Sequence, residues 1–300
     1  MKVALVTWEG LPILSEDDRL LAHALDRLGV ASTPALWTDP AVDWSGFDVI
    51  VVRSTWDYYR RAPEFLSWIE RVGAGGRLWN PPSVIRWNSH KSYLLKLEAA
   101  GIPIVPTRLS RNLDGAIAAA GASGWPDVVL KPAVSAGGYR TFRVNVSSVD
   151  PTAAWRVELA EAGEILAQPY QQEVERTGER SLVFFNGKYS HGFLRRPRLT
   201  SASPLQEGAH VVPTPEQIAL AGRVLAAAPG PTLYARVDLV EGNDGGPRLM
   251  ELELIEPALG LATSRTAAKE LAAKIRALGR RVGSGRNARA PSRPRRAKPS

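Results

Sequence analysis

The sequence contains no cysteine, and it has only two methionines and four histidines in 300 residues. Without cysteine there are no disulfides and no thiolate chemistry, so the redox compartment is not encoded and a reducing cytoplasm is the default expectation. No apolar run approaches the ~20 residues of a membrane-spanning helix. The N-terminal stretch MKVALVTWEG has too short an apolar run for a signal peptide. These absences predict a cytoplasmic globular protein that does not use a membrane.

Several motifs that define enzyme classes are also missing. The chain has no GxxxxGK[ST] loop, no GxGxxG after a strand and no GxSxG. The first two absences exclude a Walker-type nucleotide site and make a hydride-transfer enzyme on a dinucleotide fold a weak alternative. The third leaves no serine nucleophile. The four histidines are not spaced as a metal site: His23, His90, His191 and His210.

Basic residues outnumber acidic ones, but only because of one C-terminal segment. The net charge is +8, and residues 280–300 carry seven arginines, one lysine and no acid. The remaining chain has 30 basic and 30 acidic residues. Because this segment is also rich in Pro, Ser and Gly and poor in apolar residues, it predicts a disordered basic tail. The tail is the only feature that suggests nucleic-acid binding, and nucleic acid is not expected as a partner of the folded part.

What is present is an alternation of apolar strands and amphipathic helices, which predicts a mixed α/β fold. Strands at 1–7 and 47–52 with helices after them indicate a parallel α/β domain over residues 1–85. Asn88 is the expected N-cap of a helix over 89–101, and Asn186-Gly187 predicts a hairpin turn. Further expected elements are strands at 128–131, 140–146 and EILAQPY, and helices at 150–162, 215–228 and 262–278.

Three acids share one face of a second predicted hairpin. In LYARVDLV and LMELELI, side chains alternate between faces, so Arg236 and Asp238 point the same way, as do Glu251 and Glu253. Carboxylates that converge repel one another and require compensation. A hard cation such as Mg²⁺ supplies it. The alternative is a solvated outer face with salt bridges.

A lysine and a flexible loop suggest a phosphate site. Lys131 ends an apolar strand, and the loop AVSAGGY follows, in which Gly137 and Gly138 allow backbone N–H groups to approach a phosphate. Lys91 is a second cation, on the preceding helix. A lysine followed by Gly-Gly is weak evidence alone, since many hairpins contain it.

In this order, these features resemble the ATP-grasp superfamily. The matching segments are Lys91, Lys131 with its loop, AQPYQQEVERTGERSLVFFNGKY, ARVD and MELE. The closest likeness is to glutathione-synthetase-like ligases and, through RSTWDYY, WNSHKSYLLKLEAAGIPIVPT and LKPAVSAGGYRTFRV, to the O-ureidoserine cyclo-ligases of cycloserine biosynthesis. The resemblance implies a pre-ATP-grasp domain over 1–85, a small subdomain with the Gly-rich loop over 86–168 and a C-terminal subdomain with the metal site over 169–279. It also suggests a homodimer.

The resemblance assigns a role to each matching residue. Lys91, Lys131, Gly137 and Gly138 would bind the ATP phosphates. Gln168, Pro169 and Tyr170 would border adenine, and Glu179 would hold the ribose. Asp238, Glu251 and Glu253 would bind Mg²⁺, with Mn²⁺ as a substitute. Arg236 and Arg195 would steady the transferring phosphoryl group, and Arg195 is exchangeable with Arg196 or Arg198. Many members have Asn where this chain has Glu253, which adds one negative charge.

The implied activity is ATP-dependent ligation of a carboxylate to an amine. ATP would form an acyl phosphate, an amine would attack it, and ADP and phosphate would leave, while the loop over 133–139 closes to exclude water. The substrate would be a small amino-acid-like molecule, bound where open α/β sheets bind ligands, beyond a strand's carboxyl end. Four residues of RSTWDYY are placed there: Arg53 for a carboxylate, Asp57 for an ammonium group, and Ser54 and Trp56 beside them. Packing of the domain junction is the alternative for the aromatic side chains.

Two function classes compete at this stage. An intramolecular cyclo-ligase and an intermolecular dipeptide-type ligase share every nucleotide motif, so the sequence does not separate them. A nucleotide-binding regulator that uses the basic tail would bind in a salt-sensitive way without turnover. The presence of both lysines and all three acids favours the enzyme.

Overall fold

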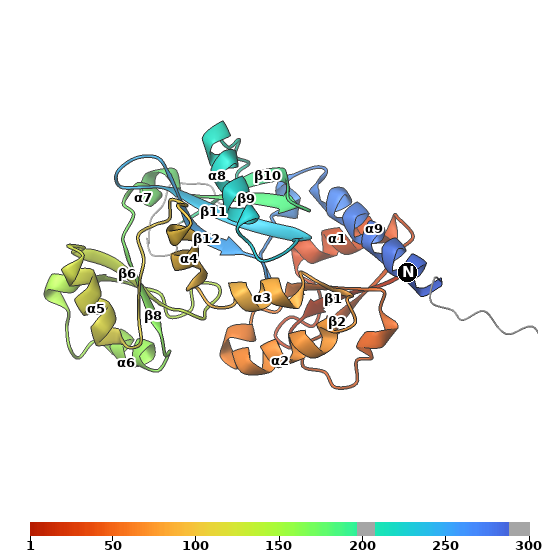
Figure 1. Ribbon diagram of the computed structural model, residues 1–300, viewed down its shortest axis with the longest axis horizontal. Coiled ribbons are helices and arrows are strands. Elements are labelled where there is room, and N and C mark those ends of the chain that lie inside the picture. The colour runs from red at the N-terminus through yellow and green to blue at the C-terminus, as the bar shows by residue number, and fades with distance from the viewer. Residues whose placement is uncertain (197–207, 288–300) are drawn as a thin grey trace, which may run out of the picture.

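The computed structural model describes residues 1–196 and 208–287, with side chains described as far as Arg280. Three four-stranded sheets form its framework, with helices packed on them (Figure 1). The predicted mixed α/β class is confirmed. Four short 3-10 helices lie in the connections: η1 (Trp44–Gly46), η2 (Tyr58–Arg61), η3 (Val146–Ser148) and η4 (Leu261–Thr263).

The first sheet is parallel and belongs to the N-terminal part of the chain. Its strand order is β2-β1-β3-β4. The central strands, β1 and β3, are apolar and buried along nearly their whole length because helices cover both faces of the sheet. Its elements are β1 (Lys2–Thr7), α1 (Glu16–Asp26), β2 (Ala31–Leu36), β3 (Val49–Ser54), α2 (Ala62–Gly73) and β4 (Leu78–Trp79).

The second sheet is antiparallel and forms the small subdomain at the left of Figure 1. Its strand order is β5-β8-β6-β7, and α5 and α6 pack on it over a core that includes Leu130, Ile165 and Leu159. Its elements are β5 (Arg108–Ser110), α5 (Leu113–Ala122), β6 (Asp127–Pro132), β7 (Phe142–Asn145), α6 (Ala154–Ala160) and β8 (Ile165–Pro169).

The third sheet is antiparallel and lies between the other two. Its order is β10-β9-β11-β12. Asn186 and Gly187 both have positive φ, so the predicted hairpin turn is confirmed. Its elements and the helices around it are α3 (Pro82–Asn88), α4 (Tyr93–Ala99), α7 (Glu173–Thr177), β9 (Glu179–Phe185), β10 (Lys188–Arg195), α8 (Pro215–Ala226), β11 (Tyr234–Glu241) and β12 (Pro247–Glu253).

The last helix, α9 (Ala267–Asn287), returns to the N-terminal part and packs beside α1 (Figure 1). Leu271 and Ile275 are fully buried in one core with Val3, Leu5 and Leu21. The N-terminal sheet therefore shares its core with the last described element. None of the described helices has the length and apolar character needed to cross a membrane.

Three predicted features differ from the structure. Asn88 does not cap a following helix: it ends α3, and its side chain bonds to β12 instead. The predicted helix at 89–101 is the shorter α4, and strand β2 was not predicted. The backbone remains helical to Asn287, past the predicted start of the tail at residue 280, and the rest of the tail lies outside the described residues.

The outer edge of β12 pairs with the backbone of residues 103–105 at Leu249, and beyond that point it is covered by side chains. The Tyr93 hydroxyl donates to the Leu252 carbonyl and accepts from the Leu252 N–H, both at 3.0 Å. The Asn88 amide donates to the Leu252 carbonyl and accepts from the Leu254 N–H, both at 2.8 Å. Because unpaired backbone groups at a sheet edge cost free energy when buried, these contacts hold β12 in place.

Tyr93→Phe tests that edge contact. The substitution keeps the ring but removes both hydrogen bonds to Leu252, so we expect the free energy of unfolding to fall by about 3 kcal/mol. Urea denaturation measures the change. Tyr189→Phe is the matched control, since none of the described residues hydrogen-bonds to the Tyr189 hydroxyl, and it should change stability by less than about 0.5 kcal/mol. Equal effects of the two substitutions would contradict the assigned role of Tyr93.

Candidate active site

A cavity of about 770 Å³ lies between the small subdomain and the third sheet, with the N-terminal part at one side. Its size suits a nucleotide or a drug-sized ligand. The structure brings most of the predicted site residues to its wall. These are Lys91, Lys131, Gly137, Gly138, Gln168, Pro169, Tyr170, Glu179, Arg195, Arg236, Glu251, Glu253 and Trp56.

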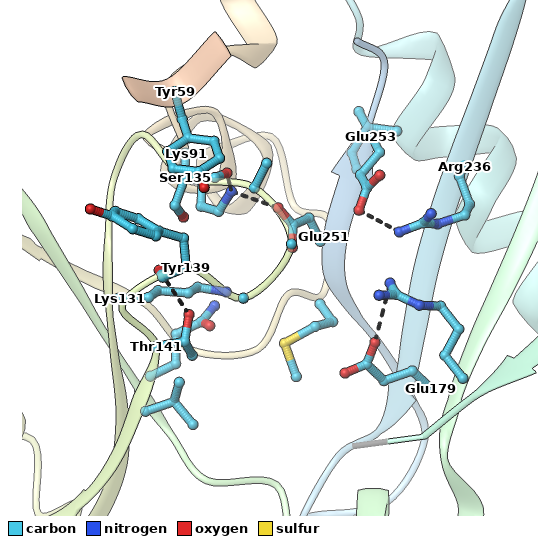
Figure 2. Close-up of a pocket in the computed structure, with 18 of the residues that line it drawn as sticks. Tyr59, Lys91, Lys131, Ser135, Tyr139, Thr141, Glu179, Arg236, Glu251 and Glu253 are labelled. Atoms are coloured by element: carbon cyan, nitrogen blue, oxygen red, sulfur yellow. Dashed lines mark hydrogen bonds and ion pairs between the residues drawn. The ribbon is translucent and has the colours of Figure 1, made fainter. Parts of the chain in front are cut away.

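Lys91 joins the Gly-rich loop to β12. Its ammonium donates to the Ser135 carbonyl and pairs with Glu251, both at 2.7 Å (Figure 2). Burial opposes ionisation of the Glu251 carboxyl, but the charges of Lys91 and Lys131 outweigh it and lower its pKa to about 2. Glu251 is therefore ionised at neutral pH.

Among the lysines and arginines of the cavity wall, Lys131 forms no ion pair with a residue that the structure describes. It ends β6, is 7% exposed, and no hydrogen bond or ion pair reaches its ammonium from the described residues. Burial lowers its pKa, and the nearby charge of Lys91 lowers it further, while Glu251 acts in the opposite direction. A buried ammonium without a partner favours an anionic ligand at this point of the cavity.

The loop after Lys131 closes one side of the cavity. Gly137 and Gly138 have φ of 61° and 76°, a conformation that side chains rarely adopt. Tyr139 then packs on Tyr59 of η2, with ring centroids 4.7 Å apart (Figure 2). The loop is therefore held against the N-terminal part of the chain.

The end of β8 and the start of the next segment line a less polar part of the cavity. The Gln168 amide donates to the Thr107 hydroxyl at 2.9 Å, and the Tyr170 N–H donates to the Asp127 carbonyl at 2.9 Å. Val129 and Met250 complete this wall. These apolar residues were missed from the sequence, because Met250 and Val129 are indistinguishable there from other apolar residues of core strands.

Glu179 and Arg195 lie at the far side of the cavity, at the paired ends of β9 and β10. Their charged groups are 3.7 Å apart. Burial raises the pKa of Glu179 to about 7, although Arg195 acts against the shift. Of the three arginines considered, Arg195 lines the cavity, Arg196 is exposed and does not line it, and Arg198 lies outside the described residues.

Strands β11 and β12 form the predicted second hairpin. Arg236 pairs with Glu253 and Asp238 pairs with Glu251 across the two strands. Arg236 binds Asp238, and it also binds Glu253, as Figure 2 shows for the second contact. Burial and the charges of Asp238 and Glu251 raise the pKa of Glu253, against the effect of Arg236. Each of the three predicted acids therefore has a cation beside it.

Asp238 differs from the two glutamates in its contacts. Its carboxylate accepts from Ser181 at 2.6 Å, from Arg195 at 3.2 Å and from Arg236 at 2.9 Å, and it is not part of the cavity wall. Within residues 1–196 and 208–287, no group of three or more His, Asp or Glu side chains is arranged to hold a metal ion. Of the three acids predicted to bind the metal, Glu251 and Glu253 line the cavity and Asp238 does not. Such a pair suits Mg²⁺, which takes one or two carboxylates together with phosphate oxygens and water.

Three of the predicted substrate contacts do not reach the cavity. Arg53 and Ser54 belong to β3 itself and are 1% exposed, and both bind the buried Asp18 carboxylate. Asp57 accepts from the Trp37 indole at 2.9 Å and lies away from the cavity wall. Strand β3 extends through Arg53 and Ser54, beyond the apolar residues that predicted it. The side chains of these two residues therefore stabilise the fold rather than line the cavity. Trp56 does line the cavity, as do Tyr58 and Tyr59.

The segment after β12 is fixed by a row of side chains. Five successive carbonyls, from residue 254 to residue 258, each accept a hydrogen bond from a side chain of another element. The donors, in that order, are Asn80 at 2.8 Å, Tyr234 at 2.8 Å, Trp56 at 3.3 Å, Arg53 at 3.0 Å and Arg236 at 2.9 Å.

Glu256 lies in this segment and its side chain lines the cavity. It was missed from the sequence because it falls outside the alternation of Glu251 and Glu253. Its position directly before Pro257, just beyond the strand, is the only sequence signal that could have found it.

Comparisons with known proteins agree with this geometry. The sequence model described as D-cycloserine synthetase DcsG, N-terminal domain, matches residues 3–80. The cycloserine biosynthesis protein DcsG of Streptomyces lavendulae is 34% identical over 274 residues, which cover 84% of this chain and 90% of that protein.

Solved structures show the same architecture. The crystal structure of D-cycloserine synthetase DcsG has 32% sequence identity and a TM-score of 0.82, and the match covers 94% of this chain and all of that one. A Bacillus anthracis D-alanine–D-alanine ligase solved with ATP has 18% identity and a TM-score of 0.67 over 95% of this chain and 99% of that one, which shows the fold alone. The chain therefore belongs to the D-cycloserine synthetase DcsG family of ATP-grasp ligases, enzymes that form C–N bonds.

Proposed function

We propose that the cavity binds Mg-ATP and a small amino acid, and that the chain joins a carboxylate to an amine through an acyl phosphate. The observation that carries this proposal is the unpaired, buried Lys131, which lies across the cavity from the acids of β12 beneath a glycine-rich loop (Figure 2). A polyanion that also carries a metal ion fits between these two walls, because it meets a cation on one side and carboxylates on the other.

The chain's own groups position and neutralise charge in this reaction. Lys131 and Lys91 hold phosphate oxygens, and Arg236 and Arg195 face the phosphoryl group as it moves to the substrate carboxylate. The apolar wall near Val129 and Met250 receives adenine, and Glu179 accepts from the ribose hydroxyls. Phosphoryl transfer requires positioning more than covalent help from protein, so the lack of a nucleophile is consistent with the proposal.

Glu251 and Glu253 would hold Mg²⁺, which would bridge phosphate oxygens and neutralise their charge. The contacts of Asp238 favour a different role from the predicted one. Its carboxylate occupies Arg236 and Arg195, so it orients the two arginines toward the cavity and acts on the metal only through them. Mn²⁺, which has similar oxygen preferences, would substitute.

The loop carrying Gly137 and Gly138 would keep water away from the acyl phosphate. The Tyr59–Tyr139 contact supports this role, because it joins the loop to the N-terminal part over the cavity. Premature hydrolysis of the activated carboxylate is the side reaction that such a cover prevents.

The substrate is proposed from the family. Because the relatives are D-cycloserine synthetases, we take O-ureidoserine as the first compound to test, with ring closure inside one molecule as the reaction. The measurement is ADP release from Mg-ATP with small amino acids and O-ureidoserine, added singly and in pairs. Release with O-ureidoserine alone is expected. Release only with a pair would replace the cyclo-ligase by an intermolecular ligase, and no release would overturn the proposed substrate class.

Lys131→Ala should reduce ADP release at least about a hundredfold, because it removes the free cation that faces the phosphates. The same measurement on Lys96→Ala, an exposed lysine of α4, is the control and should match the unmodified protein. Activity retained in Lys131→Ala would contradict the phosphate assignment.

Glu251→Gln should raise the Mg²⁺ concentration required for half-maximal activity by about tenfold, since it removes one of two carboxylates from the metal site. A titration of Mg²⁺ at saturating ATP measures this shift. Glu216→Gln, at the exposed start of α8, should leave the titration unchanged. An unchanged Mg²⁺ requirement in Glu251→Gln would place the metal elsewhere.

The KM for ATP should depend on pH through Glu179. Because burial raises the pKa of its carboxyl to about 7, Glu179 is ionised above that pH and protonated below it. Only the ionised form accepts from both ribose hydroxyls, so the KM should rise about tenfold as the pH falls from about 8 to about 6. Glu179→Gln should have the high KM at every pH. If the KM for ATP still depends on pH in Glu179→Gln, a group other than Glu179 is responsible for the titration.

A further inference from the structure

We propose that Glu256 is the residue that recognises the ammonium group of the amino-acid substrate. This inference rests on the proposed function, which supplies the substrate class. It goes further because it assigns recognition of the substrate's ammonium group to Glu256. Glu256 would be a specificity-determining residue that contacts the substrate without taking part in phosphoryl transfer.

The Glu256 residue is 8% exposed and lines the cavity, and no side chain of the described residues is bonded to its carboxylate. Burial and the charges of Glu253 and Glu251 raise the pKa of the Glu256 carboxyl, and the charge of Lys91 and a hydrogen bond from its own backbone N–H offset this only in part. Its backbone carbonyl accepts a hydrogen bond from Trp56. A buried carboxylate that no side chain pairs with costs free energy, and a cationic or hydrogen-bonding ligand would offset that cost.

The other acids of the cavity are already matched. Glu251 pairs with Lys91, Glu253 with Arg236, and Glu179 lies beside Arg195 (Figure 2). Among the lysines, arginines and acids of the wall, Lys131 and Glu256 are the two that form no ion pair in the part of the chain that the structure describes. Lys131 lies among the phosphate-binding residues, so Glu256 marks a second position, where the ligand should be positive.

The backbone holds Glu256 in place before any ligand arrives. The carbonyls of the residues on both sides, Ile255 and Pro257, accept from Tyr234 and Arg53, and that of Glu256 itself accepts from Trp56. A recognition group on so fixed a segment loses little conformational freedom when it binds. This arrangement also explains why Arg53 is buried: it supports the segment that carries Glu256.

The neighbours of Glu256 suit an amino acid. Arg236, which would meet the substrate carboxylate, donates to the carbonyl of Ala258, two residues along the same segment. An α-amino acid carries its carboxylate and its ammonium group on one carbon, so it can reach both positions. Trp56 and Tyr58 line the cavity next to Glu256, and aromatic faces attract ammonium groups.

The test compares two ligands and three variants. O-ureidoserine and its analogue with hydrogen in place of the α-amino group are titrated calorimetrically into the protein saturated with Mg²⁺ and a non-hydrolysable ATP analogue. Unmodified protein should bind the amino compound about tenfold to a hundredfold more tightly than the deamino analogue, the range expected for a hydrogen bond to a charged group.

The variants separate charge from shape. Glu256→Gln should reduce that preference to less than about threefold while the affinity for Mg-ATP stays unchanged, because it keeps the side-chain volume and removes the charge. Glu256→Asp keeps the charge and should retain part of the preference. Glu98→Gln, at an exposed position on α4, is the matched control and should behave as the unmodified protein. A full preference in Glu256→Gln, or no preference in unmodified protein, overturns the proposal.

Turnover is measured separately, so the two proposals fail in different ways. Amine-dependent binding that requires Glu256, without ADP release, would support the recognition site and overturn the proposed reaction. ADP release with equal KM values for the substrate in the unmodified protein and in Glu256→Gln would support the reaction and overturn the recognition site.

Discussion

The structure depends on the way in which side chains of the N-terminal part hold the segment that follows β12. A chain that leaves a sheet at a buried position loses the partners of its carbonyls, and the free energy of that loss must be offset by other donors. Here Asn80, Trp56 and Arg53 supply them from the first sheet and its loops. The same bonds unite the N-terminal part with the sheet that carries the acids, so the geometry of the site and the joining of the domains have one physical cause.

Charge inside the cavity is organised by pairing, and its exceptions indicate the ligand. Lys91, Arg195 and Arg236 form ion pairs with carboxylates, and the charges of Lys91 and Lys131 keep the pKa of Glu251 low in spite of burial. Lys131 and Glu256 form no ion pair with the described residues, so each is available to a group of the ligand. Preorganisation of this kind is favourable for catalysis because no reorganisation accompanies the reaction.

The sequence allowed the fold class and the β11–β12 hairpin to be predicted, because these depend on local alternation and turn residues, and most of the residues named from the ordered motifs line the cavity. Alternation indicates which side chains of one strand share a face, whereas the pairing of Arg236 with Glu253 is seen only in the structure. The sequence did not allow the roles of Arg53 and Asn88 to be predicted, since Arg53 binds Asp18 and the Pro257 carbonyl, Asn88 binds the Leu252 carbonyl, and no local pattern encodes such contacts. Glu256 was missed because it falls outside the strand alternation, and its lack of an ion pair with the described residues is visible only in the folded arrangement.

The docking of α9 on α1 has a consequence for biosynthesis. Val3, Leu5 and Leu21 complete their core only when Leu271 and Ile275 are in place. During translation the first sheet therefore emerges with one apolar face covered only in part, by α1, and this face gains the α9 side chains only after nearly all of the described chain has left the ribosome. Domains that can close their core early fold as they are made, whereas this one must wait for its last helix, and its exposed face is the surface that a chaperone would protect in the interval.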